Sequence, residues 1–72
     1  MLPNYIIGRR CREFRIREGF TQSDVAKETG YFQTNISRFE LGENDNMRIL
    51  LWYIEHGLKF VDLIGGDING KE

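Results

Sequence analysis

The sequence predicts an all-α fold, a compact domain built from five short helices. Three observations indicate this fold. Apolar residues recur at intervals of three and four along most of the chain, as on one face of a helix. Glycines and capping residues divide the chain into stretches of about one helix each. No stretch carries the alternating pattern of a β-strand.

The length and composition favour one small soluble domain. With 72 residues and 40% hydrophobic residues, the chain can bury a modest core. The single cysteine excludes an internal disulfide and disfavours a zinc site. No apolar run reaches the roughly 20 residues that cross a bilayer, and the first ten residues lack the order of a secretion signal. We therefore expect a cytoplasmic protein without cofactor, metal or membrane partner, with a domain over residues 1–66 and a flexible tail over 67–72.

Charge is distributed unevenly along the chain. The net charge is −1, but residues 1–42 hold seven Lys or Arg against five acids, a balance of +2. Residues 43–72 hold three against six, a balance of −3. Because phosphate binding depends on the local field of one face, the basic first part is compatible with a nucleic-acid partner.

The first predicted helix begins after Pro3, with Asn4 as its cap, and runs to about residue 18. Ile7, Cys11 and Phe14 recur at helical spacing and form its buried face. Cys11 is interpreted as a small core residue rather than a reactive thiol. Arginines 9, 10, 12 and 17 fall mostly off this face, toward solvent or phosphate.

The second predicted helix covers residues 22–29. Thr21 and Asp24 have the spacing of a capping box, with Asp in place of the usual Glu. Ala26 is small enough to let two helices cross closely at a steep angle. Gly30 supplies the positive φ that a sharp turn between helices requires.

The third predicted helix covers residues 33–41, with Ile36 and Phe39 facing inward. Its outer face carries amide, hydroxyl and guanidinium groups, from Gln33, Thr34, Asn35, Ser37 and Arg38. These are the groups that read base edges in a DNA major groove. The second and third helices together are therefore interpreted as a helix-turn-helix unit.

A fourth helix begins after Asn46 and ends at Gly57. We expect its buried face to be formed by Met47, Leu50, Leu51 and Ile54, with Ile49, Trp52 and Tyr53 around it. His56 is interpreted as a surface residue at the helix end. A last short helix over residues 59–64 is expected to bury Leu58 and either Leu63 or Ile64, before the Gly65-Gly66 break.

The motif Gly8-x-Arg10, Arg15, Gly19-Phe20-Thr21-Gln22, Ala26, Gly30, Gln33, Ile36-Ser37-Arg38-x-Glu40-x-Gly42 resembles the XRE or Cro/cI-type family of phage and bacterial repressors. The resemblance covers about residues 6–64. It implies a lambda-repressor-like DNA-binding domain and a transcription regulator that needs no cofactor.

The resemblance also implies individual roles. Base contacts fall to Gln33, Thr34, Asn35 and Arg38. The resemblance gives a phosphate contact to Gln22. Ser37 is a further candidate for phosphate, and so is one of Arg9 and Arg10 on the first helix, with Arg10 preferred. Arg15 and Glu40 match a structural ion pair between the first and third helices. Outside this framework, the same polar residues would be interpreted as an ordinary solvated helix face.

Two departures from the family pattern limit the expected affinity. Phe32 stands where the family usually has a Ser or Thr cap, so its ring is free to meet a thymine methyl group or another protein. The loop after Gly42 offers Glu43 and Asp45 in place of basic residues, which disfavours phosphate.

Weak binding of one copy to one half-site is normally compensated by two copies that bind two half-sites together. We therefore expect a homodimer on an inverted-repeat operator in double-stranded DNA. Phe60, Val61 and the Trp52–Tyr53 region are the candidate dimer surface, although for Trp52 we favour burial in the core.

Two other classes of function remain as alternatives. A protein-interaction module on the same fold, such as an antirepressor or an antitoxin-like partner, would use Phe32 and the acidic face. An enzyme is disfavoured, because the chain has one His, one Cys, no glycine-rich phosphate loop and no evident pair of catalytic carboxylates. No catalytic residue is therefore assigned.

Overall fold

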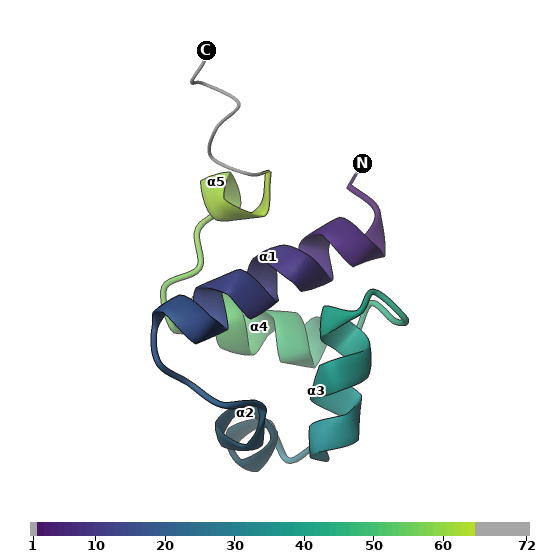
Figure 1. The fold of residues 1–72 in the computed structure, drawn as a ribbon, viewed down its shortest axis with the longest axis vertical. Coiled ribbons are helices and arrows are strands. Elements are labelled where there is room, and N and C mark those ends of the chain that lie inside the picture. The colour runs from purple at the N-terminus through teal and green to yellow at the C-terminus, as the bar shows by residue number, and fades with distance from the viewer. Residues whose placement is uncertain (1, 65–72) are drawn as a thin grey trace.

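The computed structural model describes residues 2–64, and these form five helices without a strand (Figure 1). The helices are α1 (Asn4–Arg17), α2 (Gln22–Thr29), α3 (Gln33–Glu40), α4 (Met47–Glu55) and α5 (Phe60–Leu63). The predicted all-α fold of five short helices is therefore confirmed. None of the described helices combines the length and hydrophobicity needed to cross a lipid bilayer.

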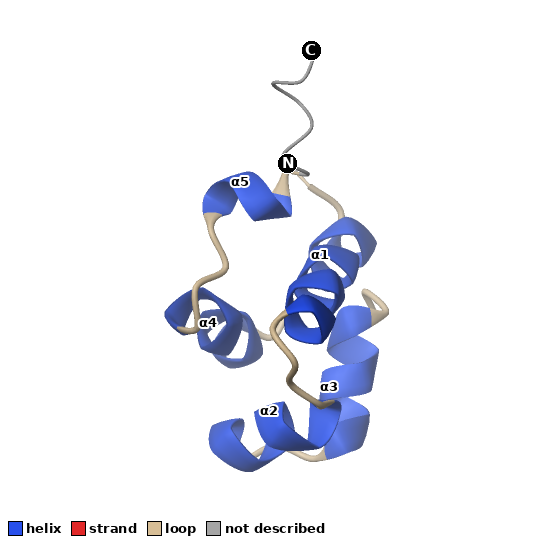
Figure 2. Ribbon diagram, turned by 60° about the vertical axis from the view of Figure 1, so that its left-hand side comes forward, coloured by secondary structure: helices blue, strands red, loops and turns tan. Residues whose placement is uncertain are grey.

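Three of the other four helices pack against α1, and α2 packs against α3 and α4. α3 and α5 both contact α1, and α4 contacts both α1 and α2. Figures 1 and 2 show α2 and α3 at one end of the molecule and α5 at the other. The helix-turn-helix segment therefore forms one end of the domain, held from behind by α1 and α4.

All helices except α5 contribute buried residues to a single core, and the α4–α5 connection contributes one more. The buried hydrophobic residues are Cys11, Phe14, Val25, Ala26, Ile36, Phe39, Ile49, Trp52, Tyr53 and Leu58. Tyr53 lies centrally among the rings: it stacks on Phe39 at 5.9 Å and meets Phe14 and Trp52 edge to face at 6.5 and 5.2 Å. Such ring pairs add to the stabilisation that burial itself provides.

Gly8 allows α1 to pack directly on the backbone of α3. A Cβ atom at Gly8 would lie 2.4 Å from the carbonyl oxygen of Phe39 and 2.5 Å from that of Glu40. No side chain fits there without moving one helix. The glycine therefore fixes the distance between α1 and the C-terminal end of α3.

The caps agree with the sequence in two cases and differ in the third. Thr21 and Asp24 form the predicted capping box of α2, and the Asn46 side chain accepts a hydrogen bond from the Ile49 N–H at 3.1 Å. The prediction that Asn4 caps the first helix was wrong. Pro3 holds the N-cap position in an extended conformation, and its carbonyl accepts from the N–H groups of residues 6 and 7, so Asn4 is already the first helical residue.

The prediction of which face of α4 is buried was also wrong. Its core residues are Ile49, Trp52 and Tyr53, while Met47, Leu51 and Ile54 are 62%, 44% and 44% exposed and Leu50 is half-buried. Both sets have helical spacing, so periodicity alone could not choose between them. In the observed orientation Nε1 of Trp52 donates to Oε1 of Glu28 at 2.7 Å, and the Tyr53 hydroxyl donates to Oε2 of Glu40. These bonds favour this orientation, because buried Trp and Tyr side chains each need a polar partner. The Trp52–Tyr53 region is thereby excluded as a dimer surface.

Two helices, α3 and α5, are shorter than predicted. α3 ends at Glu40, with an exposed Leu41 as its C-cap, and α5 covers only Phe60–Leu63. Leu58 is buried as expected, and residues 63 and 64 are half-buried. The expected break at 65–66 and tail at 67–72 lie outside the described residues.

Candidate nucleic-acid interface

The turn between α2 and α3 is made by a left-handed glycine. Gly30 has φ +82°, and its N–H donates to the carbonyl of Ala26 at 2.9 Å. A Cβ atom at Gly30 would meet nothing within 4 Å, so the glycine is required for its conformation rather than for space. This turn directs α3 steeply away from α2 (Figure 2).

The outer face of α3 is polar and accessible. Gln33 and Thr34 are exposed, Asn35 and Ser37 are half-buried, and the Arg38 side chain is 67% exposed. The opposite face buries Ile36, Phe39 and Glu40. The structure thus brings all four candidate base-reading residues, together with Ser37, onto one helix.

Two residues of α2 hold the side chain of Gln33. The Gln33 amide donates from Nε2 to Oε1 of Gln22 at 3.4 Å, and the Ser23 hydroxyl donates to Oε1 of Gln33 at 3.2 Å. Both ends of the amide are engaged, which orients its donor and acceptor before any ligand arrives. A preoriented side chain loses less conformational freedom on binding.

Gln22 in turn is anchored to the core through Glu40. Its Nε2 donates to Oε1 of Glu40 at 3.1 Å. Arg15 donates to both oxygens of the same carboxylate, from Nε at 2.7 Å and from Nη2 at 2.9 Å, and the Tyr53 hydroxyl donates to Oε2. A continuous chain of hydrogen bonds therefore runs from α1 and α4, through α3 and α2, to the exposed amide of Gln33.

The pKa values of the buried residues around Glu40 are shifted in the directions that these hydrogen bonds require. The hydrogen bond to Glu40 raises the pKa of Arg15. Burial, followed by the hydrogen bond to Glu40, raises the pKa of Tyr53 above its usual range. Arg15 also donates from Nη1 to the carbonyl of Phe20 at 3.0 Å, which ties the entry of α2 to the same site. The buried charges are thus paired and hydrogen-bonded, as burial of charge requires.

The start of α3 is stabilised by Asn35 rather than by Phe32. Oδ1 of Asn35 accepts a hydrogen bond from the Phe32 N–H at 2.9 Å. The phenyl ring itself has no hydrogen-bonding atom and is 79% exposed. One carbonyl oxygen of Asn35 is therefore committed to the helix start, while its amide nitrogen remains available for a base edge.

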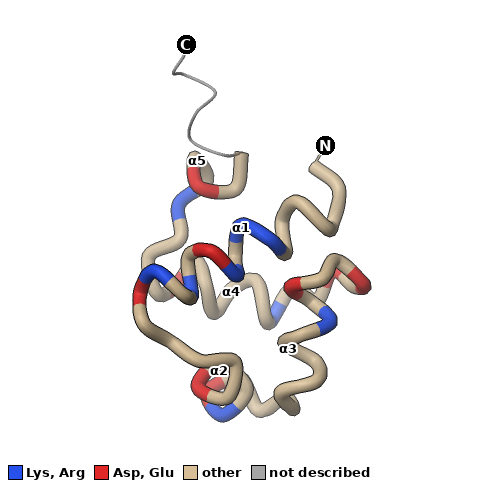
Figure 3. Tube along the Cα trace, in the orientation of Figure 1, with Lys and Arg blue, Asp and Glu red and all other residues tan. Residues whose placement is uncertain are grey.

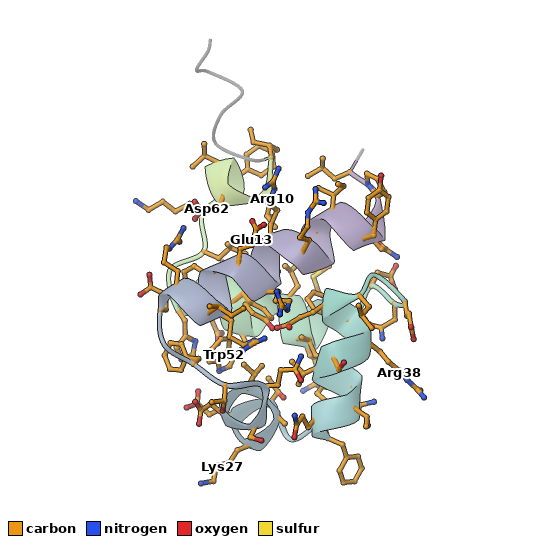
Figure 4. The ribbon with its side chains drawn as sticks, viewed as in Figure 1. Arg10, Glu13, Lys27, Arg38, Trp52 and Asp62 are labelled. Atoms are coloured by element: carbon orange, nitrogen blue, oxygen red, sulfur yellow. The ribbon has the colours of Figure 1, made fainter. Side chains whose placement is uncertain are left out.

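Arg10 and Arg38 occupy different surroundings. Figure 4 shows Arg10 beside Glu13 on the part of α1 nearer α5, away from α2 and α3. Its Nη1 lies 3.4 Å from Oε1 of Glu13. Figure 4 also shows Arg38 extending outward from α3, where its Nε lies 3.9 Å from Oε1 of Glu43. The structure therefore groups Arg38 with the α3 face and separates Arg10 from it.

Two contributors were missed from the sequence. Tyr53 was interpreted as apolar surface, although a tyrosine that becomes buried needs a partner for its hydroxyl. Ser23 was given no role because its contact with Gln33 spans ten positions and two helices. Among the described residues, no three His, Cys, Asp or Glu side chains cluster in a way that could hold a metal ion.

The geometry of α2 and α3 and the comparison with known protein families indicate the same class of protein. α2, the turn at Gly30 and α3 form a helix-turn-helix unit on an all-helical scaffold. Residues 6–48 match the model of the helix-turn-helix domain family, and because this is more than half of the chain, the protein belongs to that family. The assignment agrees with the resemblance to XRE-type domains and makes the protein a DNA-binding one. No curated protein and no solved structure matches the chain significantly.

Proposed function

We propose that the protein is a sequence-specific transcription regulator of the phage or mobile-element repressor type, which reads operator DNA with α3. The observation that carries this proposal is the hydrogen-bond chain from Arg15 and Tyr53 through Glu40 and Gln22 to Gln33. It holds an exposed amide in a fixed orientation from inside the core. Precise orientation is what a two-bonded contact with a base requires.

Each polar residue of the α3 face has a role in this proposal. Gln33 binds adenine through N6 and N7, Arg38 binds guanine or a phosphate, and Thr34 and Asn35 contact neighbouring base edges. Among the phosphate contacts, Gln22 and Ser37 lie beside this face and Arg10 contributes only if the DNA extends along α1. Each good base contact discriminates against the wrong base by about 1–3 kcal/mol.

Pairing of two copies completes the proposed operator complex. Glu43 and Asp45 lie in the loop that follows α3 and weaken the attraction of one domain for phosphate. Two domains on an inverted repeat, with half-sites about one helical turn apart, compensate for a weak half-site. Phe60 and Val61 on α5 are 75% and 40% exposed and are the remaining candidates for the dimer surface.

Selection of binding sites from random duplex DNA tests the proposal. We expect enrichment of an inverted repeat whose half-sites are one helical turn apart. Failure to enrich any sequence at low salt would contradict it. The same experiment is repeated on Asn35→Ala, and urea unfolding of this variant is measured in parallel because the Asn35 side chain also supports the helix start. A changed sequence preference at unchanged stability would assign base reading to Asn35.

A protein partner is the second candidate, favoured by the apolar stripe that α4 leaves exposed. Met47, Leu51 and Ile54 lie on that stripe. An antirepressor or antitoxin-like role would place another protein there or on Phe32. Recovery of one stoichiometric protein partner, without any DNA shift at low salt, would favour this function over operator binding.

A further inference from the structure

Phe32 is an exposed aromatic ring directly before the first residue of α3. It is 79% exposed, whereas phenylalanine is usually among the buried residues of a domain. Among residues 2–64, the aromatic ring pairs do not include Phe32. The ring therefore contributes little to the packing of the described fold.

The ring is not needed to begin the helix either. N-cap positions favour Ser, Thr, Asp or Asn, whose side chains cap the first N–H groups of a helix. The Phe32 side chain makes no such bond, and the Phe32 N–H instead donates to Oδ1 of Asn35. A residue that opposes the local preference without a packing role indicates a function at that position. An exposed phenyl ring offers an apolar surface and a π face, and an apolar contact is the interaction that its carbon-only side chain makes most readily.

The surroundings of the ring fit DNA better than an apolar protein surface. The next three residues are the polar Gln33, Thr34 and Asn35, so the ring is a single apolar group among amides and a hydroxyl. Residues 29–39 contain no Asp or Glu, and Figure 3 shows the first part of α3 without charge. The major groove offers the complementary arrangement: an isolated thymine methyl group beside polar base edges and negative phosphates.

We propose that Phe32 contacts the 5-methyl group of a thymine next to the adenine that Gln33 reads, and so makes operator recognition depend on that methyl group. Phe32 and Gln33 are adjacent at the same end of α3, and Gln33 is held in place by Gln22 and Ser23. Phenylalanine is one of the side chains suited to a thymine methyl contact. This inference rests on the proposed function.

The test uses the duplex enriched by selection from random DNA, with each thymine replaced in turn by deoxyuridine. The replacement keeps base pairing and removes only the methyl group. At one thymine in each half-site we expect the wild-type affinity to fall about two- to fivefold, the range expected for the loss of one buried methyl contact. Phe32→Ala is expected to bind the thymine and uracil duplexes equally at that position.

Tyr5→Ala is the matched control, because it removes a ring that is 59% exposed but lies on α1. It should retain the wild-type uracil effect even if its overall affinity falls. Phe32→Ala should unfold at the wild-type urea midpoint, since its ring is exposed. That measurement separates loss of contact from loss of fold.

Three results would overturn the inference. The first is an enriched duplex that shows no uracil effect, and the second is an equal uracil effect in wild type and Phe32→Ala. The third is a stoichiometric protein partner that Phe32→Ala fails to bind while the uracil effect persists, which would assign the ring to that protein. If no duplex is enriched at all, the proposed function fails, and the inference fails with it.

Discussion

Arg15 on α1 donates two hydrogen bonds to the carboxylate of Glu40 on α3, across 25 positions of the sequence. Both side chains are buried, and the carboxylate also receives hydrogen bonds from Gln22 and Tyr53. Three other helices therefore meet at the last residue of α3, the helix that carries the polar outer face. This carboxylate therefore joins α3 to the three other helices, in addition to the packing of Ile36 and Phe39 in the core.

Glu40→Gln is predicted to destabilise the domain strongly. The substitution keeps the shape of the side chain but leaves the buried charge of Arg15 without a counter-charge, which typically costs about 3–5 kcal/mol. Urea unfolding followed by the fluorescence of the buried Trp52 measures the loss. Glu55→Gln makes the same charge change at an exposed position and should stay within about 0.5 kcal/mol of wild type. Equal unfolding midpoints for the two variants would contradict the role given to Glu40.

Gly8→Ala is predicted to destabilise the domain despite the better helix propensity of alanine. A glycine-to-alanine change inside a helix normally stabilises it by about 1 kcal/mol. Here the added Cβ would lie within 2.5 Å of two carbonyl oxygens of α3, and such overpacking costs about 1–3 kcal/mol. Urea unfolding gives the sign directly. An unchanged or increased stability would mean that α1 and α3 are not held in contact at this glycine.

Cys11 is predicted to be unreactive in the folded protein. Burial, followed by the nearby charge of Glu40, raises its pKa from 9.0 to about 12. Since the raised pKa belongs to the folded state, the contribution of Cys11 to stability is complete below pH 9 and is lost as the pH rises toward 12. Alkylation with iodoacetamide at pH 8.5 should be slow in buffer and fast in urea. Equal rates in the two conditions would contradict the burial of this thiol.

Glu43→Gln is predicted to strengthen DNA binding at low salt. Its carboxylate lies 3.9 Å from the guanidinium of Arg38 and opposes the attraction of that group for DNA. Two unit charges about 4 Å apart in water interact by about 1 kcal/mol, so we expect up to roughly fivefold tighter binding, decreasing as salt rises. Glu55→Gln on α4 is the control of equal charge. An equal gain in both variants would indicate a net-charge effect rather than a local one.

The helix-turn-helix segment was predictable because its signals are local. Thr21 and Asp24 cap α2 within four residues, Gly30 marks the turn, and the bounds of α2 agree with the prediction. Polar residues at the right spacing identified the outer face of α3. Each of these features depends on side-chain type and on separations shorter than one helix.

The remaining features depend on contacts between distant residues. α4 carries two apolar stripes of equal period, and only packing against α1 and α2 buries Ile49, Trp52 and Tyr53 rather than Met47, Leu51 and Ile54. The same packing brings the Tyr53 hydroxyl to Glu40. No local sequence pattern predicts the contact between Tyr53 and Glu40. The complete hydrogen-bond chain behind Gln33 can therefore be identified only from the three-dimensional structure.

Base reading by Gln33 from a fixed orientation is tested most directly by one comparison. Wild type and Gln33→Ala are titrated with the selected duplex, and with the same duplex carrying a G·C pair in place of the contacted A·T pair, over a range of salt concentrations. We predict that wild type prefers the A·T duplex by an amount corresponding to about 1–3 kcal/mol, and that Gln33→Ala loses this preference. Both should keep the same salt dependence, about 0.9 log units per log unit of salt for each neutralised phosphate. An undiminished preference in Gln33→Ala, or wild-type binding that ignores both salt and sequence, would contradict the account.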